Sequence, residues 1–143
     1  MVHISKREIS EQLSKKLVEQ LASLLVAQDT LKSSKAFLYE MLSHTERIML
    51  AKRIGILFFL HRGYSLYATS QILAVSESTV ARIKNKLDDG EYVHIVQTIQ
   101  RKEHRESILG TIETLVRFGL SGGPQAHLRK KVTSDIRAWR QGA

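Results

Sequence analysis

The sequence contains no cysteine and only one proline, Pro124, among its 143 residues. Without cysteine the chain can form no disulfide, no thiolate zinc site and no cysteine nucleophile, which fits a reducing compartment. With a single proline to interrupt them, long helices can form, and we expect an all-α protein. The first residues, MVHISKREISEQL, are charged and lack the apolar segment of a signal peptide, so we expect a cytoplasmic protein.

Long hydrophobic runs are also missing. The most apolar segment, IGILFFL at residues 54–60, is far shorter than the roughly 20 residues of a transmembrane helix. Lys52 and Arg53 precede it, and His61 and Arg62 follow it, so we interpret it as a buried helix. A helix that is apolar on every side needs more cover than a small domain supplies. We therefore expect this segment at the centre of a homodimer.

Acidic residues are outnumbered by basic ones. The chain has 14 aspartates and glutamates against 22 lysines and arginines, a net charge of +8. A positive potential attracts polyanions, so this balance favours a nucleic-acid partner without requiring one.

Signatures of catalysis are absent from the sequence. The six histidines are scattered, and we find no HExxH spacing, glycine-rich phosphate loop or nucleophile elbow. Glu103, His104 and Glu106 are close in sequence, but neighbouring residues on a helix point in different directions. We expect no enzyme, no cofactor and no metal site.

Apolar residues at helical spacing outline the first elements. Ile9, Leu13, Leu17, Leu21 and Leu24 recur at intervals of four and three, which predicts a helix over about residues 5–27. A second helix is expected at 31–42. The sequence SHTE at 43–46 is a capping box, which predicts a third helix that ends at the glycine at 63.

Residues 65–87 predict two short helices joined by a tight turn. Ser65 can cap the first helix, over 66–73, and Ser76 the second, from 77 to about 87. Ser70 is small where the helices would cross, and Ala74 is small in the turn. Four apolar residues stand where the helices would pack together: Leu73, Val75, Val80 and Ile83. This spacing is typical of a DNA-binding helix-turn-helix, but an ordinary helical hairpin satisfies it as well.

The outward residues of the second helix are mainly small or basic, which suits entry into the major groove, about 12 Å wide. We expect two hydroxyl residues of this helix, Ser78 and Thr79, to contact bases and its basic residues to contact phosphates. Two residues of the first helix should lie near the DNA backbone. The full set of candidate DNA-binding residues is Tyr67, Ser70, Glu77, Ser78, Thr79, Ala81, Arg82, Lys84 and Lys86.

A longer stretch, about residues 17–99, resembles the tryptophan repressor superfamily, and within it the Trp-repressor-related, YerC/YecD-like branch. The match is carried by LSHTERIMLAKRIGILFFLHRG at 42–63 and LAVSESTVARIKNKLDDG at 73–90. The resemblance implies an all-helical, intertwined homodimer whose helix-turn-helix units enter successive major grooves of double-stranded DNA. It also implies a role in transcription regulation, of the repressor type.

The resemblance further implies a possible effector pocket. Its residues here would be Ser43, Arg53, Thr79, Arg82 and Ile83. In tryptophan-binding members two arginines, at the places of Arg53 and Arg82, hold the indole. Here Ile83 replaces a glycine that makes room for the indole, and Lys86 replaces a serine that helps hold the ligand's amino group. The isoleucine would fill the slot and the ammonium would repel the ligand, so we expect no tryptophan binding.

These positions also admit other interpretations. Ile83 would serve equally well to pack the recognition helix permanently against the third helix. Arg82 is better suited to a phosphate contact than to a ligand, and Arg53 would also suit an ion pair with a nearby carboxylate.

Beyond residue 101 the resemblance ends, so we divide the chain into a repressor-like domain at 1–101 and a helical extension at 102–143. Tyr92, Ile95, Val96 and Ile99 should dock a helix on the core just before this boundary. The extension predicts an amphipathic helix with its apolar side around residues 108–116, a break at 122–124, and a basic terminal helix. This last helix fits a DNA-binding arm, a helix that completes the dimer, or a docking surface for another protein.

We therefore expect a sequence-specific, DNA-binding transcription regulator of the tryptophan repressor type. The alternative is a helical interaction protein, or a non-specific DNA-binding module, that keeps the fold without reading an operator.

Overall fold

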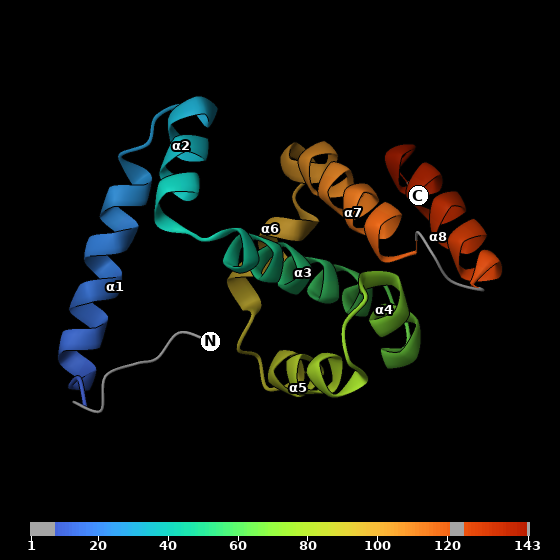
Figure 1. Cartoon of the computed structure of the whole chain (residues 1–143), viewed down its shortest axis with the longest axis horizontal. Helices are drawn as coiled ribbons and strands as arrows, with labels where there is room; N and C mark the ends of the chain where they lie inside the picture. The colour runs from blue at the N-terminus through green and yellow to red at the C-terminus, as the bar shows by residue number, and fades with distance from the viewer. Residues whose placement is uncertain (1–7, 121–124, 143) are drawn as a thin grey trace. The chain divides into compact units, whose positions relative to one another are not determined.

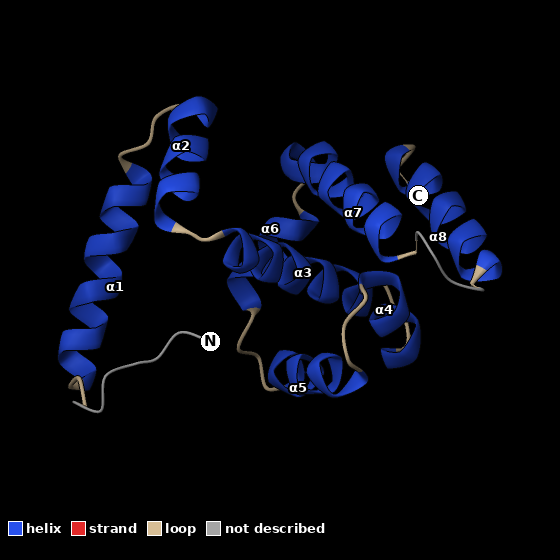
Figure 2. Ribbon diagram, in the orientation of Figure 1, coloured by secondary structure: helices blue, strands red, loops and turns tan. Residues whose placement is uncertain are grey.

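The computed structural model of this chain describes residues 8–120 and 125–142. Over these ranges the chain forms eight α-helices and one short 3-10 helix, with no strand, as Figure 2 shows. The predicted all-α class is confirmed. Packing divides the chain into two compact units, Met1–Arg47 and Ile48–Ala143. None of the helices described is long and apolar enough to cross a membrane.

The first unit contains α1 (Glu11–Val26) and α2 (Leu31–Met41). Helix α1 begins later than predicted because Ser10 is its N-cap and accepts a hydrogen bond from the Leu13 amide; predicted positions 5–7 lie outside the described residues. Thr30 caps α2 through a reciprocal pair of hydrogen bonds with Ser33. Neither helix buries a single residue. The large apolar side chains of α1 and its N-terminal flank stay about half exposed or more: Ile9, Leu13, Leu17, Val18, Leu21, Leu24, Leu25 and Val26.

Helix α3 (His44–His61) begins at the predicted capping box. The Ser43 amide donates to the Glu46 carboxylate at 2.8 Å, and the Glu46 amide donates to Ser43 Oγ at 3.3 Å. The first of these bonds is the main reason that the pKa of Glu46 lies below its usual value. The helix closes at Gly63, whose φ of +83° suits glycine and lets the chain turn away.

Most of the apolar run of α3 is buried within its own chain. Residues 55–60 lie in one core with side chains of α4 (Leu66–Leu73), α7 (Arg105–Gly119) and α8 (Ala126–Arg140). The expectation that this run needs a second subunit for cover was therefore wrong, because the C-terminal helices supply the cover. Figure 1 shows α7 and α8, coloured from orange to red, beside one another.

The predicted amphipathic and terminal helices of the extension are α7 and α8, and both belong to this core. Helix α8 buries four side chains at intervals of four, four and three: Leu128, Val132, Ile136 and Trp139. The Trp139 ring meets Phe58 of α3 edge to face, with 5.2 Å between ring centroids. The terminal helix thus packs in the core of its own chain, which is a role that was not among those considered from its sequence. The expected break at 122–124 lies outside the described residues.

A polar contact also ties α8 to the segment after α3. The Tyr64 hydroxyl donates to the Asp135 carboxylate, which in addition pairs with Lys131 at 3.0 Å. Burial and this bond raise the pKa of Tyr64. Burial alone would raise the pKa of Asp135, but the bonds from Tyr64 and Lys131 outweigh it and lower that pKa.

Helix α6 (Val93–Gln100) docks less fully than predicted. Tyr92 and Ile99 pack against the core, but Ile95 is 38% exposed and no residue of the helix is buried. The short 3-10 helix η1 (Lys102–His104) then leads into α7.

Candidate nucleic-acid interface

Helices α4 and α5 (Glu77–Asp88) form the predicted pair of short helices, which we call the α4–α5 pair. Each helix begins at the predicted serine cap. Ser65 Oγ accepts from the Ala68 amide at 3.0 Å, and Ser76 Oγ accepts from the Thr79 amide at 3.2 Å. These bonds satisfy amides that no helical carbonyl can reach, so they fix where both helices start.

The turn between the helices depends on Ala74. This residue adopts the left-handed conformation, with φ of +50° and ψ of +57°, and the next amide, of Val75, donates back to the Ser70 carbonyl at 3.0 Å. An L-residue pays for that conformation with steric strain, which is mild for the small alanine side chain. The Lys52 ammonium of α3 donates to the Ala74 carbonyl at 3.0 Å and so holds the turn from the side of α3.

The inward face of the pair is buried. Ile72 and Leu73 of α4 and Val80 and Ile83 of α5 join the core, as the spacing predicted. Ser70 is buried with them: it is 1% exposed, and its hydroxyl donates to the Tyr67 carbonyl at 2.7 Å. The Ser70 hydroxyl is therefore buried and already bonded within α4, so we remove Ser70 from the candidate contacts.

The outward face of α5 carries the remaining candidates. Glu77, Ser78 and Arg82 are exposed, Thr79 and Ala81 are half-buried, and Tyr67 on α4 is 58% exposed. Three hydroxyls gather at the start of α5, since Ser76 Oγ lies 3.1 Å from that of Ser78 and 2.8 Å from Thr79 Oγ1. This arrangement offers both donors and acceptors at the N-terminus of a helix, where the backbone also favours anions.

The cations of α5 are not equally available. Lys84 Nζ holds both carboxylate oxygens of Asp88, at 2.6 and 2.7 Å, and Lys86 pairs with Glu91 at 3.1 Å. Arg82 has no ion-pair partner among the described residues. A DNA phosphate would have to displace a carboxylate from Lys84 or from Lys86. At Arg82 it would have no such ion pair to break.

Of the residues of the suggested effector pocket, Ser43 lies in the first unit and the other four lie in the second. Ser43 caps α3 in the first unit. Arg53 and Arg82 are exposed in the second unit, and Ile83 is 8% exposed within the core. The two best-formed cavities in the described part of the chain are lined by other side chains. The observed burial of Ile83 fits its interpretation as a packing residue of α5.

Sequence reasoning missed two contributors to this region. The bond from Lys52 to the turn joins residues 22 positions apart, and nothing in the local sequence announces it. The pairing of Lys84 with Asp88, by contrast, follows from their spacing of four on one helix and could have been foreseen.

No group of three metal-ligating side chains is found in the ranges that the structure describes. Glu103 and His104, considered above, form only an exposed contact at 3.6 Å.

No family model matches the chain, and no curated protein or solved structure is significantly similar to it. The resemblance to the tryptophan repressor superfamily therefore stays a prediction from the two quoted segments.

Proposed function

We propose that this protein is a sequence-specific, DNA-binding transcription regulator of the tryptophan repressor type, in which the α4–α5 pair is the helix-turn-helix. The observation that carries the proposal is the division of α5 into two faces. Val80 and Ile83 anchor the helix in the core, and the opposite face presents small residues, hydroxyls and Arg82, which forms no ion pair with a described residue. A helix that recognises bases needs one face that is packed against its own protein and an opposite face that is accessible to DNA.

The dimensions of α5 suit a major groove. Its 12 residues span about 18 Å, and the short side chains at its first turn allow close approach to the base edges. In this proposal Ser78 and Thr79 contact bases directly or through water, and Arg82 binds phosphate. Tyr67 reaches the DNA backbone from α4. The long residues that read guanine in a bidentate manner are scarce on this face, so DNA shape contributes to recognition.

The proposal includes a homodimer that forms through the first unit. Helices of the length of α1 and α2 are barely stable alone in water, and here they bury none of their apolar side chains within the chain. A stripe of leucines spaced by four and three residues on α1 would be covered by the same stripe of a second copy. Two copies would also present two α4–α5 pairs to a near-palindromic site.

The proposal includes no catalytic role, no cofactor and a cytoplasmic location. It also includes no response to tryptophan. Ile83 of α5 has its side chain packed in the core, and an indole in the suggested effector pocket would have to displace that side chain.

The direct test is a selection of bound sequences from a random duplex pool at near-physiological salt, followed by affinity measurements on the enriched site. The double variant Thr79→Ala/Arg82→Ala should lose the enrichment. Lys130→Ala, which removes a cation of α8 outside the α4–α5 pair, should keep the same motif. Removal of Arg82 alone should lower the slope of log affinity against log salt by about one.

Enrichment of a two-fold-related motif by the natural chain, and its loss in the double variant, would support the proposal. Equal retention of unrelated sequences by all of these proteins would contradict operator recognition. That second outcome favours a helical interaction protein, for which the exposed leucine stripe of α1 is the specific observation.

A further inference from the structure

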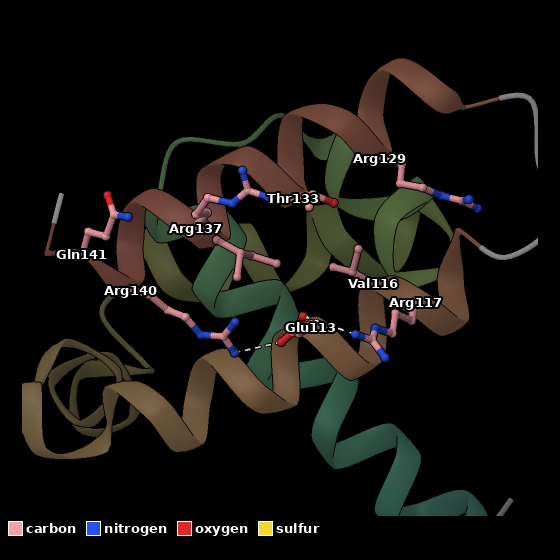
Figure 3. A pocket seen from close by; sticks show the side chains of 9 residues that line it. Glu113, Val116, Arg117, Arg129, Thr133, Arg137, Arg140 and Gln141 are labelled. Carbon is pink, nitrogen blue, oxygen red and sulfur yellow. Dashed lines mark hydrogen bonds and ion pairs between the residues drawn. The ribbon is translucent and has the colours of Figure 1, made fainter.

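The extension contains a cavity that has no part in the proposed DNA contact. It lies between α7 and α8 and has a volume of about 700 Å³, within the range of small-molecule sites. Four arginines line it together with a single carboxylate: Arg117, Arg129, Arg137, Arg140 and Glu113. Figure 3 shows these side chains arriving from both helices. Such an excess of guanidinium groups around one cavity attracts an anion.

Glu113 shows how a carboxylate is bound there. Arg140 of α8 donates to its Oε2 at 2.8 Å, and Arg117 of α7 lies 3.5 Å from its Oε1, so the two arginines approach it from two sides (Figure 3). The hydrogen bond from Arg140 is the main cause of the lowered pKa of Glu113, which therefore stays charged. Arg140 also pairs with Glu106 at 3.6 Å, so two carboxylates balance only part of the charge of four guanidinium groups.

The other two arginines of the cavity, Arg129 and Arg137, form no ion pair with a described carboxylate. Arg129 donates to the carbonyl of Leu120, which leaves its positive charge without a carboxylate. Arg137 has no ion pair or hydrogen bond with any described residue. Two apolar side chains, Val116 and Ile136, also line the cavity, and each is 5% exposed. The cavity thus combines unused donors for an anion with a surface for an apolar group.

We propose that the α7–α8 cavity binds a small organic anion, a carboxylate or phosphate ester, whose charged group lies against Arg137 and whose apolar part lies on Val116 and Ile136. DNA phosphate is the less suitable ligand. Its contacts usually come from cations spread along a surface, whereas here the arginines border a cavity that Val116 and Ile136 also line. This site differs from the effector pocket that the resemblance implies, and it does not depend on the function proposed above.

The test uses calorimetric titration of the full chain with phenyl phosphate, inorganic phosphate and the neutral benzyl alcohol. We expect phenyl phosphate to bind with a Kd of about 1 mM or tighter and more tightly than the other two. Arg137→Gln should weaken it at least tenfold, by the loss of one charge-assisted hydrogen bond. Because Arg137 is exposed and forms no ion pair or hydrogen bond with a described residue, this variant should fold normally, which its thermal unfolding will check.

The matched control is Lys130→Gln, which removes an exposed charge of α8 outside the cavity. It should leave the affinity within about twofold, because exposed charges at a distance are screened by salt. Equal weakening by both variants, no binding of phenyl phosphate, or equal affinity for inorganic phosphate would overturn the proposal. A short DNA duplex that displaces phenyl phosphate would assign these arginines to DNA and would overturn it as well.

Discussion

Replacing Gly119 by alanine should separate α7 from α4. An ideal Cβ on Gly119 would lie 2.0 Å from the carbonyl oxygen of Ile72 and 2.9 Å from its carbonyl carbon. A carbon and an oxygen ordinarily approach no closer than about 3.3 Å. Because both clashing atoms of Ile72 are backbone atoms, no rotamer change relieves the contact, and the two helices must move apart by more than about 1 Å.

The cost follows from what that movement disrupts. Ile72, Ile112, Val116 and Leu120 are all 5% exposed or less and lie in the core shared by these helices. A gap of about 1 Å removes up to half of the dispersion energy at each contact across it, and overpacking of this kind typically costs 1–3 kcal/mol. We expect Gly119→Ala to lower the free energy of unfolding by about 3 kcal/mol.

The same helix supplies the control. Gly110 lies in α7, and a Cβ there would meet nothing within 4 Å. Gly110→Ala should therefore raise the free energy of unfolding by about 0.5–1 kcal/mol, through helix propensity alone. Both variants would be unfolded in urea at the protein concentration used for the natural chain, since association would shift the midpoint. A Gly119→Ala midpoint equal to that of the natural chain would refute the close approach of α7 to α4.

Three further predictions concern single side chains. Ala74→Gly should raise the free energy of unfolding by about 0.5–1 kcal/mol, because glycine tolerates the left-handed turn; a lower urea midpoint would contradict this. Asp88→Asn should release Lys84 from its ion pair and raise the affinity for the selected duplex. Asp89→Asn removes the same charge without affecting this ion pair, so it should raise the affinity less. Equal effects of the two variants would mean that the ion pair is irrelevant to binding. The pKa of Asp135 is lowered on folding, so its stabilisation is complete above the usual pKa of 3.8 and is lost as the pH falls through the folded value. With Asp135→Asn, the urea midpoint should fall less steeply below about pH 4. The same decline in the variant and the natural chain would show that Asp135 does not cause this loss of stability.

Local signals explain the parts of the fold that the sequence predicted well. Helix starts at Ser43, Ser65 and Ser76 follow from hydroxyl caps that act within three residues. The bounds of α4 and the start of α5 agree with prediction for this reason. The burial of Val80 and Ile83 follows from their spacing on α5, because residues three apart lie on one face of a helix.

Long-range packing explains what the sequence did not predict. The apolar pattern of α3 shows that residues 55–60 need cover, but the pattern is the same whether the cover comes from a second subunit or from α7 and α8. Ser70 is another example. A small polar residue suits both a helix crossing and a phosphate contact, and only the fold shows that its hydroxyl is already bonded to Tyr67.

The arginine-lined cavity was beyond sequence reasoning for a related reason. The arginines of α8 were visible as a basic terminal segment, but their convergence with Arg117 and Glu113 depends on how α7 and α8 pack. A run of basic residues does not distinguish an open surface from the wall of a cavity.

The extension also changes where the proposed dimer must form. The resemblance covers about residues 17–99, yet the core of that segment is completed by Leu109, Ile112 and Val132, which lie outside it. The second unit therefore buries its apolar run without a partner, and α4 rests on α7 at Gly119. The uncovered apolar faces that remain are concentrated on α1 and α2. We therefore assign the contact of the proposed homodimer to the first unit, while α7 and α8 pack against α4 within each copy.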